Sequence, residues 1–476
     1  MHVTAIDRYD IEPGALTEWT LAPTSELVQS DVPPSYNQRF HLDTARTHGV
    51  GSSVWMAASF DVPGPLDRTV LQRTFELITR RHDALWTGFE VLPDRISRLM
   101  VPPHAVAVAP SEALEFDDTA ALRTHLRARF TEVCDPLTFP AFLFATVERA
   151  HSTTVLAAFD HTIVDGYSLV IAIRELRQVY ELICASPSIA DEDVHTHLDD
   201  PGSFMSYCVD ESAEEEVDAS DPRIRAWAHF YEACGGTAPS FPLDLGVQPG
   251  SPAPQASDVR RLLGAADADR FDRVCTAAGG AMFTGVLTAI GTTLRREGAP
   301  TVVPLQFPLH TRLDPRWEGS IGWLTTSAPI TVRIDHPDDF ATSLTDTHAS
   351  FRSSLSLCGV SMPQVRAGVG DGYRRTSTDL FMVSYIDYRR LAGTERHREI
   401  NAHHISNVTV CDDAQFWLSR TDEGLSIRSR FPNTAIAQST IERFLCRLVQ
   451  VLTEVCDRGV MVRDPEEDLV LIESAG

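Results

Sequence analysis

Apolar residues along this chain recur with two periods, one typical of strands and one typical of helices. Residues 53–62 read as a strand that ends at a proline. Leu71, Phe75 and Ile78 follow at positions i, i+4 and i+7, which predicts the buried face of a helix. The same order returns from Thr153 to about Ile183, where a strand leads into a strongly periodic helix. Strands and helices mixed in this way predict an α/β (α+β) fold.

The second half of the chain repeats this organisation. Helices are predicted over Ala268–Ala278 and Phe283–Arg296, and a long helix with an apolar stripe from Ile441 to Val455 closes the chain. Strands are predicted at 301–307, 323–334, 379–388, 404–411, 414–420 and 424–431, in addition to Thr87–Leu92 in the first half. Two mixed halves of similar size predict two lobes with a cleft between them.

A polar stretch separates the two halves. Seven of the twelve residues from Asp210 to Asp221 are acidic, which predicts a solvated loop, and proline-rich sequence follows at 239–254. We therefore expect an N-terminal lobe over residues 1–205, a connection over 206–257 and a C-terminal lobe over 258–476.

The charged residues exclude several classes of partner and chemistry. The 476 residues carry 41 basic and 66 acidic side chains, a net charge of −25, which argues against nucleic acid and anionic membranes as partners. All the basic side chains are arginine, because the sequence contains no lysine. Walker-type phosphate loops, Schiff-base and pyridoxal-phosphate chemistry, and Ser–Lys dyads all need a lysine amine and are therefore excluded.

Cysteine usage and the N-terminal sequence both indicate a cytoplasmic protein. The nine cysteines are odd in number and form no CxxC pair, so neither a zinc ribbon nor a redox pair is indicated. No signal peptide is recognisable, and no apolar run is long enough to span a bilayer. The GxSxG, HExxH and GxGxxG signatures are also absent.

One candidate site remains, at the end of the strand that precedes the most periodic helix. There the sequence runs Asp160-His161-Thr162-Ile163-Val164-Asp165-Gly166. Such a turn presents polar side chains beside a helix N-terminus, where a histidine can act as a general base. A structural histidine beside a helix cap explains the motif equally well, so its residues alone leave both interpretations open.

Further segments agree with one family in their order and spacing. HxxxDG after a strand resembles the HHxxxDG signature of the condensation-domain and chloramphenicol acetyltransferase-like superfamily. Residues 81–87 resemble its early helix end, 308–312 its "pvsgR" segment and 319–329 its crossover strand. Residues 33–38, 383–387 and 416–420 with 430–432 resemble the actinobacterial polyketide-associated (Pap-type) acyltransferases in particular.

The resemblance implies a fold, a mechanism and roles for individual residues. It implies two acetyltransferase-like lobes in a V-shaped pseudo-dimer, with His161 as the general base in a central tunnel. The backbone N–H of Gly166 would help to hold the oxyanion. Asp165 would pair with Arg312 as a structural contact that fixes the loop.

This chain departs from the family pattern at two positions. Asp160 replaces the first histidine of HHxxxDG, at a position generally considered structural, and Thr326 replaces the usual asparagine of the crossover strand. Contacts with substrate are expected from Trp323, Thr326, Ser384, Tyr385 and Trp417, although aromatic residues on strands more often belong to the core.

The expected function is transfer of an acyl group from a carrier-protein or CoA thioester to a hydroxyl of a polyketide, a sugar such as trehalose, or another secondary metabolite. No metal or bound redox cofactor is implied; the donor is acyl-CoA or a phosphopantetheinyl acyl carrier, acting as co-substrate. The fold requires no second chain, so a monomer is expected. Two alternatives stay open: amide formation with an amine acceptor, and a catalytically silent recruitment module.

Overall fold

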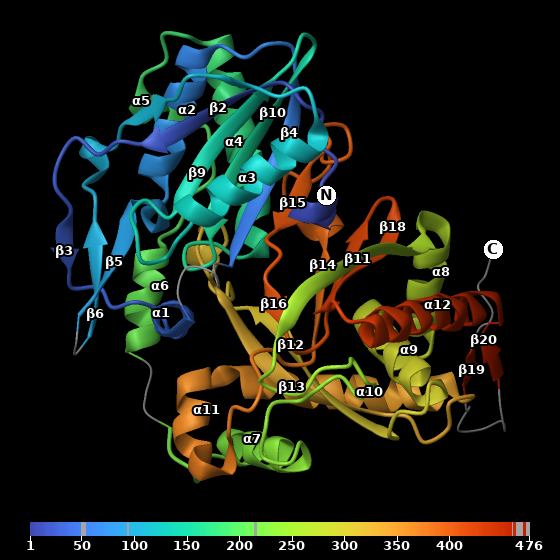
Figure 1. The fold of residues 1–476 in the computed structure, drawn as a ribbon. Coiled ribbons are helices and arrows are strands. Elements are labelled where there is room, and N and C mark those ends of the chain that lie inside the picture. Colours follow the sequence, from blue (N-terminus) through green and yellow to red (C-terminus); the bar gives the residue numbers. More distant parts are fainter. Residues whose placement is uncertain (49–53, 93–94, 214–216, 459, 463–469, 473–476) are drawn as a thin grey trace. The chain divides into compact units, whose positions relative to one another are not determined.

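The computed structural model describes residues 1–48, 54–92, 95–213, 217–458, 460–462 and 470–472 (Figure 1). The chain divides into two units, each built from segments that are not continuous in sequence. Unit 1 comprises Met1–Glu215, His310–Thr325 and Leu391–Thr409, and unit 2 comprises Glu216–Leu309, Thr326–Arg390 and Val410–Gly476. Two short segments from the second half of the chain therefore belong to the same unit as the HxxxDG sequence.

Unit 1 is organised around a mixed sheet. Its strands run in the order β1 (His2–Ala5), β15 (His403–Ser406), β4 (Trp55–Pro63), β10 (Ser152–Asp160), β9 (Phe142–Glu148), β2 (Ala15–Leu21) and β7 (Val108–Pro110), and β8 (Leu114–Glu115) also pairs with β2. Strands β4 and β10 are antiparallel, with Trp55 opposite Asp160. Since β10 has a neighbour on each side, the residues at its carboxyl end are held in the middle of the sheet.

Helices lie on both faces of this sheet. The helices of unit 1 are α1 (Tyr36–His48), α2 (Arg68–Arg81), α3 (Thr119–Val133), α4 (Gly166–Ala185), α5 (Asp191–His195) and α6 (Phe204–Ser212). In β9, Leu143 packs in one core cluster with Phe130 of α3, whereas Phe144 stacks on Phe75 of α2 at 4.5 Å. Successive strand residues point to opposite faces, so α2 and α3 lie on opposite sides. A smaller sheet has the order β3 (Val28–Ser30), β6 (Ile96–Met100) and β5 (Thr87–Val91).

Unit 2 contains a second mixed sheet. Its order is β13 (Thr325–Arg333), β12 (Val302–His310), β14 (Met382–Asp387), β17 (Gln415–Thr421), β18 (Gly424–Pro432), β11 (Ala253–Gly264) and β16 (Val410–Cys411). Its helices are α7 (Pro222–Ala233), α8 (Ala265–Ala277), α9 (Met282–Arg296), α10 (Phe340–Leu355), α11 (Met362–Val369) and α12 (Ala435–Arg458), and β19 (Val460–Val462) pairs with β20 (Val470–Ile472). The predicted stripe from Ile441 to Val455 lies in the core of this unit.

One predicted strand is wrong. Residues 404–411 were expected to form a single strand, but the chain leaves one sheet and enters the other within this stretch. His403–Ser406 form β15, which pairs with β4 in unit 1, whereas Val410 and Cys411 form β16, which pairs with β11 in unit 2. Alternating apolar residues report extended backbone, but they carry no information about which sheet supplies the partner. The first residue of the predicted strand 53–62 lies outside the described residues.

The acidic stretch from Asp210 to Asp221 is not one solvated loop. Asp210 and Glu211 belong to α6, and Glu211 accepts hydrogen bonds from the Tyr36 backbone N–H at 2.7 Å and from the Tyr207 hydroxyl at 3.1 Å. Asp221 caps the start of α7. Residues 214–216 lie outside the described residues. A carboxylate with fixed donors loses little by leaving water, so the density of acidic residues wrongly predicted a continuous loop here.

No single helix within the described ranges is long and apolar enough to cross a membrane. Helices α8 and α9 reach that length and composition only when taken together, and they are bent by 94°. Residues 284–294 of α9 are all buried inside unit 2.

Candidate active site

The HxxxDG sequence forms the turn between β10 and α4. Asp160 is the last residue of β10, and its backbone N–H donates to the carbonyl of Ala141 at 2.9 Å. The N–H of His161 donates to the carbonyl of Val54 at 3.0 Å, and Gly166 is the first residue of α4. Backbone contacts on both sides of β10 therefore fix where the His161 side chain begins.

The His161 imidazole has a defined orientation. Its Nδ1 lies 2.9 Å from the carbonyl oxygen of Val164, which is only an acceptor, so Nδ1 carries the proton and Nε2 keeps a free lone pair. The indole of Trp323 stacks on the ring with centroids 3.9 Å apart and planes tilted by 29°. Burial, and then the charge of His41, hold the pKa of His161 below its ordinary value. The ring is therefore neutral, and Nε2 can accept a proton, at pH 7.

Asp160 is completely buried and hydrogen-bonded through both carboxylate oxygens. Its Oδ1 accepts from the backbone N–H of Thr162 at 2.8 Å and from the Thr162 hydroxyl at 2.6 Å. Its Oδ2 lies 3.3 Å from Nε2 of His41, which comes from α1. Sequence reasoning did not identify His41. The available signal was its position three residues after Gln38, the last residue of the segment 33–38 that resembles the family.

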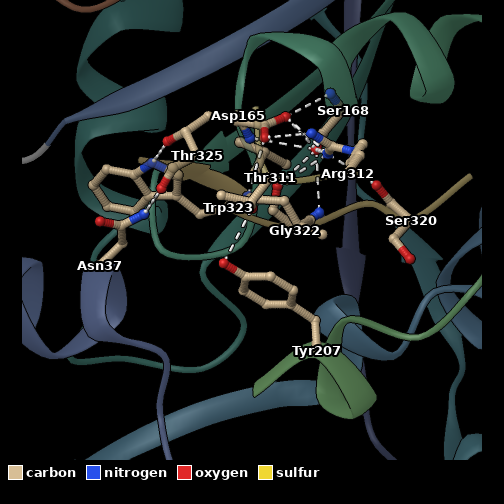
Figure 2. Close-up of polar contacts among 12 residues, drawn as sticks. Asn37, Asp165, Ser168, Tyr207, Thr311, Arg312, Ser320, Gly322, Trp323 and Thr325 are labelled. Carbon is tan, nitrogen blue, oxygen red and sulfur yellow. Dashed lines mark hydrogen bonds and ion pairs between the residues drawn. The ribbon is translucent and has the colours of Figure 1, made fainter. Parts of the chain in front are cut away.

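Asp165 caps helix α4. Its Oδ1 accepts from the backbone N–H of Ser168 at 2.9 Å and from the Ser168 hydroxyl at 2.8 Å, and its own N–H donates to that hydroxyl at 3.3 Å (Figure 2). This reciprocal pattern is a capping box, in which side chains satisfy N–H groups that have no acceptor inside the helix. Ser168 was not predicted from the sequence, although the spacing Asp-x-x-Ser before an apolar helix is a signal that could have identified it.

Arg312 forms a two-pronged ion pair with Asp165. Nη1 donates to Oδ2 at 2.7 Å and Nη2 to Oδ1 at 3.0 Å, and the two side chains are only 2% and 3% exposed. Nη2 also donates to the carbonyl of Ser320 at 3.0 Å (Figure 2). Burial by itself would raise the pKa of Asp165, but Arg312 and Ser168 together hold it below its usual range. The pairing that the family resemblance implied is present. It is a buried contact that joins the start of α4 to the segment carrying Arg312.

The segment that carries Trp323 is fixed by the same network. The backbone N–H of Leu324 donates to Oδ2 of Asp165 at 3.1 Å. The Trp323 indole N–H donates to the Thr325 hydroxyl at 2.8 Å, and the Asn37 amide donates to the Thr325 carbonyl at 2.7 Å (Figure 2). The stacking of Trp323 on His161 is thus held from two elements that are distant in sequence.

The remaining predicted substrate contacts lie in unit 2. Ser384 of β14 is paired in register with Trp417 of β17, and the guanidinium of Arg428 lies 4.0 Å from the centre of the Trp417 ring. Tyr385 points to the opposite face from Ser384 and stacks on Phe283 of α9 at 5.5 Å. Tyr385 therefore packs against the unit 2 core, and contacts of Ser384, Tyr385 and Trp417 with substrate stay predictions.

The last two predicted residues also have clear positions. Thr326 belongs to β13 and to unit 2, and its contact with substrate stays a prediction. Gly166 is the first helical residue of α4, so its N–H is one of those without an acceptor inside the helix. In the described part of the chain, no group of three or more His, Cys, Asp or Glu side chains is placed to hold a metal ion.

Comparison with known proteins identifies the family. A family model described as "Condensation domain" matches residues 28–469. The chain is 25% identical to the acyltransferase PapA3 of Mycobacterium tuberculosis over 96% of this chain and 97% of that protein. It is 26% identical to the 2'-acyl-2-O-sulfo-trehalose (hydroxy)phthioceranyltransferase PapA1 of Mycobacterium tuberculosis, over 97% of this chain and 90% of that protein. The solved structure of a PapA2 acyl transferase superposes with a TM-score of 0.85 at 23% identity, over 96% of this chain and 100% of that one.

The fold and the similarity to acyltransferases over 96–97% of the chain point to the same family as the HxxxDG sequence at the β10–α4 turn. The chain belongs to the condensation-domain family and is an acyltransferase.

Proposed function

We propose that this protein transfers an acyl group from a thioester to a sugar hydroxyl, with His161 as the general base. The observation that carries the proposal is the His161 ring itself: Nδ1 donates to the Val164 carbonyl at 2.9 Å, which leaves the lone pair on Nε2 to accept a proton. The similarity to PapA1 supports the acceptor class, since that protein is named for acyl transfer to a sulfated trehalose.

The proposed reaction proceeds in two stages. Nε2 of His161 accepts the hydroxyl proton while the hydroxyl oxygen attacks the thioester carbonyl, and a tetrahedral oxyanion forms. The carbon–sulfur bond then breaks, and the leaving thiolate takes the proton from the imidazolium. The products are an ester and a free thiol, and the enzyme forms no covalent intermediate.

Two neighbours of His161 support this role. The imidazolium that forms during the reaction lies against the face of Trp323, whose π-electrons attract a cation. The Val164 carbonyl keeps the proton on Nδ1, so the ring does not change tautomer between turnovers. The N–H of Gly166 is the proposed donor to the oxyanion.

The proposed donor is an acyl-CoA or an acyl group on the phosphopantetheine arm of a carrier protein. Both donors carry phosphate groups, and the protein has a net charge of −25. Bulk charge therefore does not attract the donor, and we propose that local arginine side chains bind it instead.

The test uses the purified full-length protein with a series of acyl-CoA donors and with trehalose, trehalose 2-sulfate or a primary amine as acceptor. Mass spectrometry of the products separates ester from amide. His161→Ala is expected to abolish ester formation while the melting temperature stays within about 2 °C of the wild type, because the ring contributes one hydrogen bond and one ring stack to a chain of 476 residues.

The matched control is His151→Ala, which removes an exposed histidine from the turn at the other end of β10. This variant should retain the wild-type rate. Ester formation at the wild-type rate by His161→Ala would disprove the assigned base, and amide as the only product would replace the hydroxyl acceptor with an amine.

A further inference from the structure

Helix α1 contacts the β10–α4 turn at two positions one helical turn apart. Nε2 of Gln38 donates to the carbonyl of Thr162 at 2.8 Å, and Nε2 of His41 lies 3.3 Å from Oδ2 of Asp160. Residues at i and i+3 lie on the same face of a helix, so one face of α1 supports the residues on both sides of His161.

The first of these contacts is rigid. Gln38 is fully buried, and its Oε1 accepts from the Ser35 backbone N–H at 3.0 Å and from Nη2 of Arg98 at 2.8 Å. Arg98 is itself held by the carbonyls of Val32 and Pro33, at 3.2 and 3.1 Å. Because Oε1 accepts from these donors, the Gln38 amide has one orientation, and α1 is fixed where it meets the turn.

The second contact is electrostatic. Oδ1 of Asp160 already accepts both donors of Thr162, so Oδ2 is left for His41. Across the described residues, His41 is the only basic side chain within ion-pair distance of the Asp160 carboxylate. A fully buried carboxylate is costly without a partner, and the His41 ring supplies that partner from α1.

His41 also contacts the ring that stacks on His161. Its imidazole meets the edge of Trp323 with centroids 5.8 Å apart and planes at 76°, while the face of Trp323 stacks on His161. His41 is therefore linked to His161 in two ways. It contacts the carboxylate of Asp160, the residue before His161, and it contacts the Trp323 indole that stacks on His161.

We propose that His41 is a positioning residue whose pairing with Asp160 balances the charge beside His161 and replaces the first histidine of the family motif. The substitution of that histidine by Asp160 is then compensated from α1. This proposal deepens the proposed function and rests on the role of His161 as the base.

The charged groups that face His161 act in opposite directions. Asp160 from β10 and Asp165 from the α4 cap each raise the pKa of His161, whereas His41 from α1 lowers it. The charge of Asp165 is compensated by Arg312 at 2.7 Å. The balance beside the ring is therefore set by His41 and Asp160, and removal of either one leaves the other uncompensated.

The experiment measures the His161 titration in the full-length protein and three variants, His41→Gln, Asp160→Asn and the double variant. Gln at position 41 keeps an amide donor for Asp160 but carries no charge. NMR of protein labelled with ¹³C at histidine Cε1 follows the ring, and the resonance is assigned by its loss in His161→Gln. In parallel, kcat/KM for ester formation is measured from pH 4.5 to 8.

His41→Gln is expected to raise the pKa of His161 and to move the acid limb of the pH–rate profile upward by roughly one pH unit. Asp160→Asn is expected to move both in the opposite direction, and the double variant should lie between the two single variants. The matched control is His125→Gln, because His125 faces Glu18 at 3.5 Å elsewhere in unit 1 and should leave both curves unchanged.

The two readouts separate the failure of this proposal from the failure of the proposed function. An NMR titration of His161 that stays the same in both single variants overturns the charge balance. Shifts of the NMR titration without any shift of the acid limb support the balance but reject His161 as the base.

Discussion

Replacement of Arg312 by alanine tests whether the Asp165–Arg312 pair secures the candidate site. The arginine donates to both oxygens of Asp165 and to the carbonyl of Ser320, and it is almost fully buried. Its removal leaves the Asp165 carboxylate buried without a counter-charge. That carboxylate keeps three other donors, which are the backbone N–H and hydroxyl of Ser168 and the N–H of Leu324.

The expected loss of unfolding free energy in Arg312→Ala follows from the ion pair that is broken and the hydrogen bonds that Asp165 keeps. Breaking a buried ion pair by removing one partner costs about 3–5 kcal/mol, because an uncompensated charge stays in the interior. The three donors that remain on Asp165 favour the lower end of this range. Activity should fall with stability, since the same carboxylate binds the N–H of Leu324, next to the Trp323 that stacks on His161.

The assay is urea unfolding followed by circular dichroism, with Arg316→Ala as the matched control. Arg316 lies four residues away and also pairs with carboxylates, those of Asp314 and Asp210, but its side chain is 59% exposed. An exposed pair contributes about 0–1 kcal/mol, so the control should unfold close to the wild type. The reasoning is refuted if Arg312→Ala costs no more than Arg316→Ala.

The difference in unfolding free energy between the wild type and Arg312→Ala should change with pH in one direction. The pKa of Asp165 is lower in the folded protein than in the unfolded chain, because Arg312 and Ser168 outweigh the effect of burial. The stability that the pair contributes is then complete above about pH 4, the ordinary aspartate pKa, and is lost as the pH falls through the folded value. The gap between wild type and Arg312→Ala should therefore narrow below pH 4.

Two other buried carboxylates should respond to pH in opposite directions. Glu175 would have a raised pKa from burial alone, but His82 at 2.8 Å and Arg81 at 2.9 Å lower it to about 2; Glu175→Gln should cost about 3 kcal/mol at pH 7 by urea unfolding, and this loss should shrink below pH 4.5. Burial raises the pKa of Asp413 to about 7, although its carboxylate accepts two backbone N–H bonds, one from Phe241 at 3.0 Å. The stability contributed by protonated Asp413 is lost as the pH rises from about 4 through 7, so Asp413→Asn should be more stable than the wild type at pH 8 by on the order of 3 kcal/mol, with no gain at pH 4. Equal stability of Asp413→Asn and wild type at pH 8 would show that this carboxylate is not strained by burial.

Local patterns in the sequence were sufficient to predict those elements whose structure depends on residues a few positions apart. The periodicity of the apolar positions predicted α4 and α12, which are Gly166–Ala185 and Ala435–Arg458 in the structure. The apolar run Val155–Phe159 placed the HxxxDG turn between a strand and a helix, where it lies. These features follow from side-chain spacing within a few residues, which fixes the faces of helices and strands.

Contacts between segments that are distant in sequence could be predicted only in part. The pairing of Asp165 with Arg312 was available from a family resemblance, but no spacing in the chain links positions 147 residues apart. The contact of His41 with Asp160, and the stacking of Trp323 on His161, were not predicted. A ring stack depends on the relative orientation of two side chains, and sequence periodicity does not specify it.

The sequence by itself determined the type of most elements and the location of the candidate base, because both depend on local spacing and on one motif. The tertiary structure decided which sheet receives each strand, as the division of residues 403–411 between two sheets shows. It also decided which residues surround His161, since His41 and Trp323 arrive from an earlier helix and a later segment of unit 1. These outcomes depend on burial and hydrogen bonding summed over the whole fold, so they cannot be read from a short window of the chain.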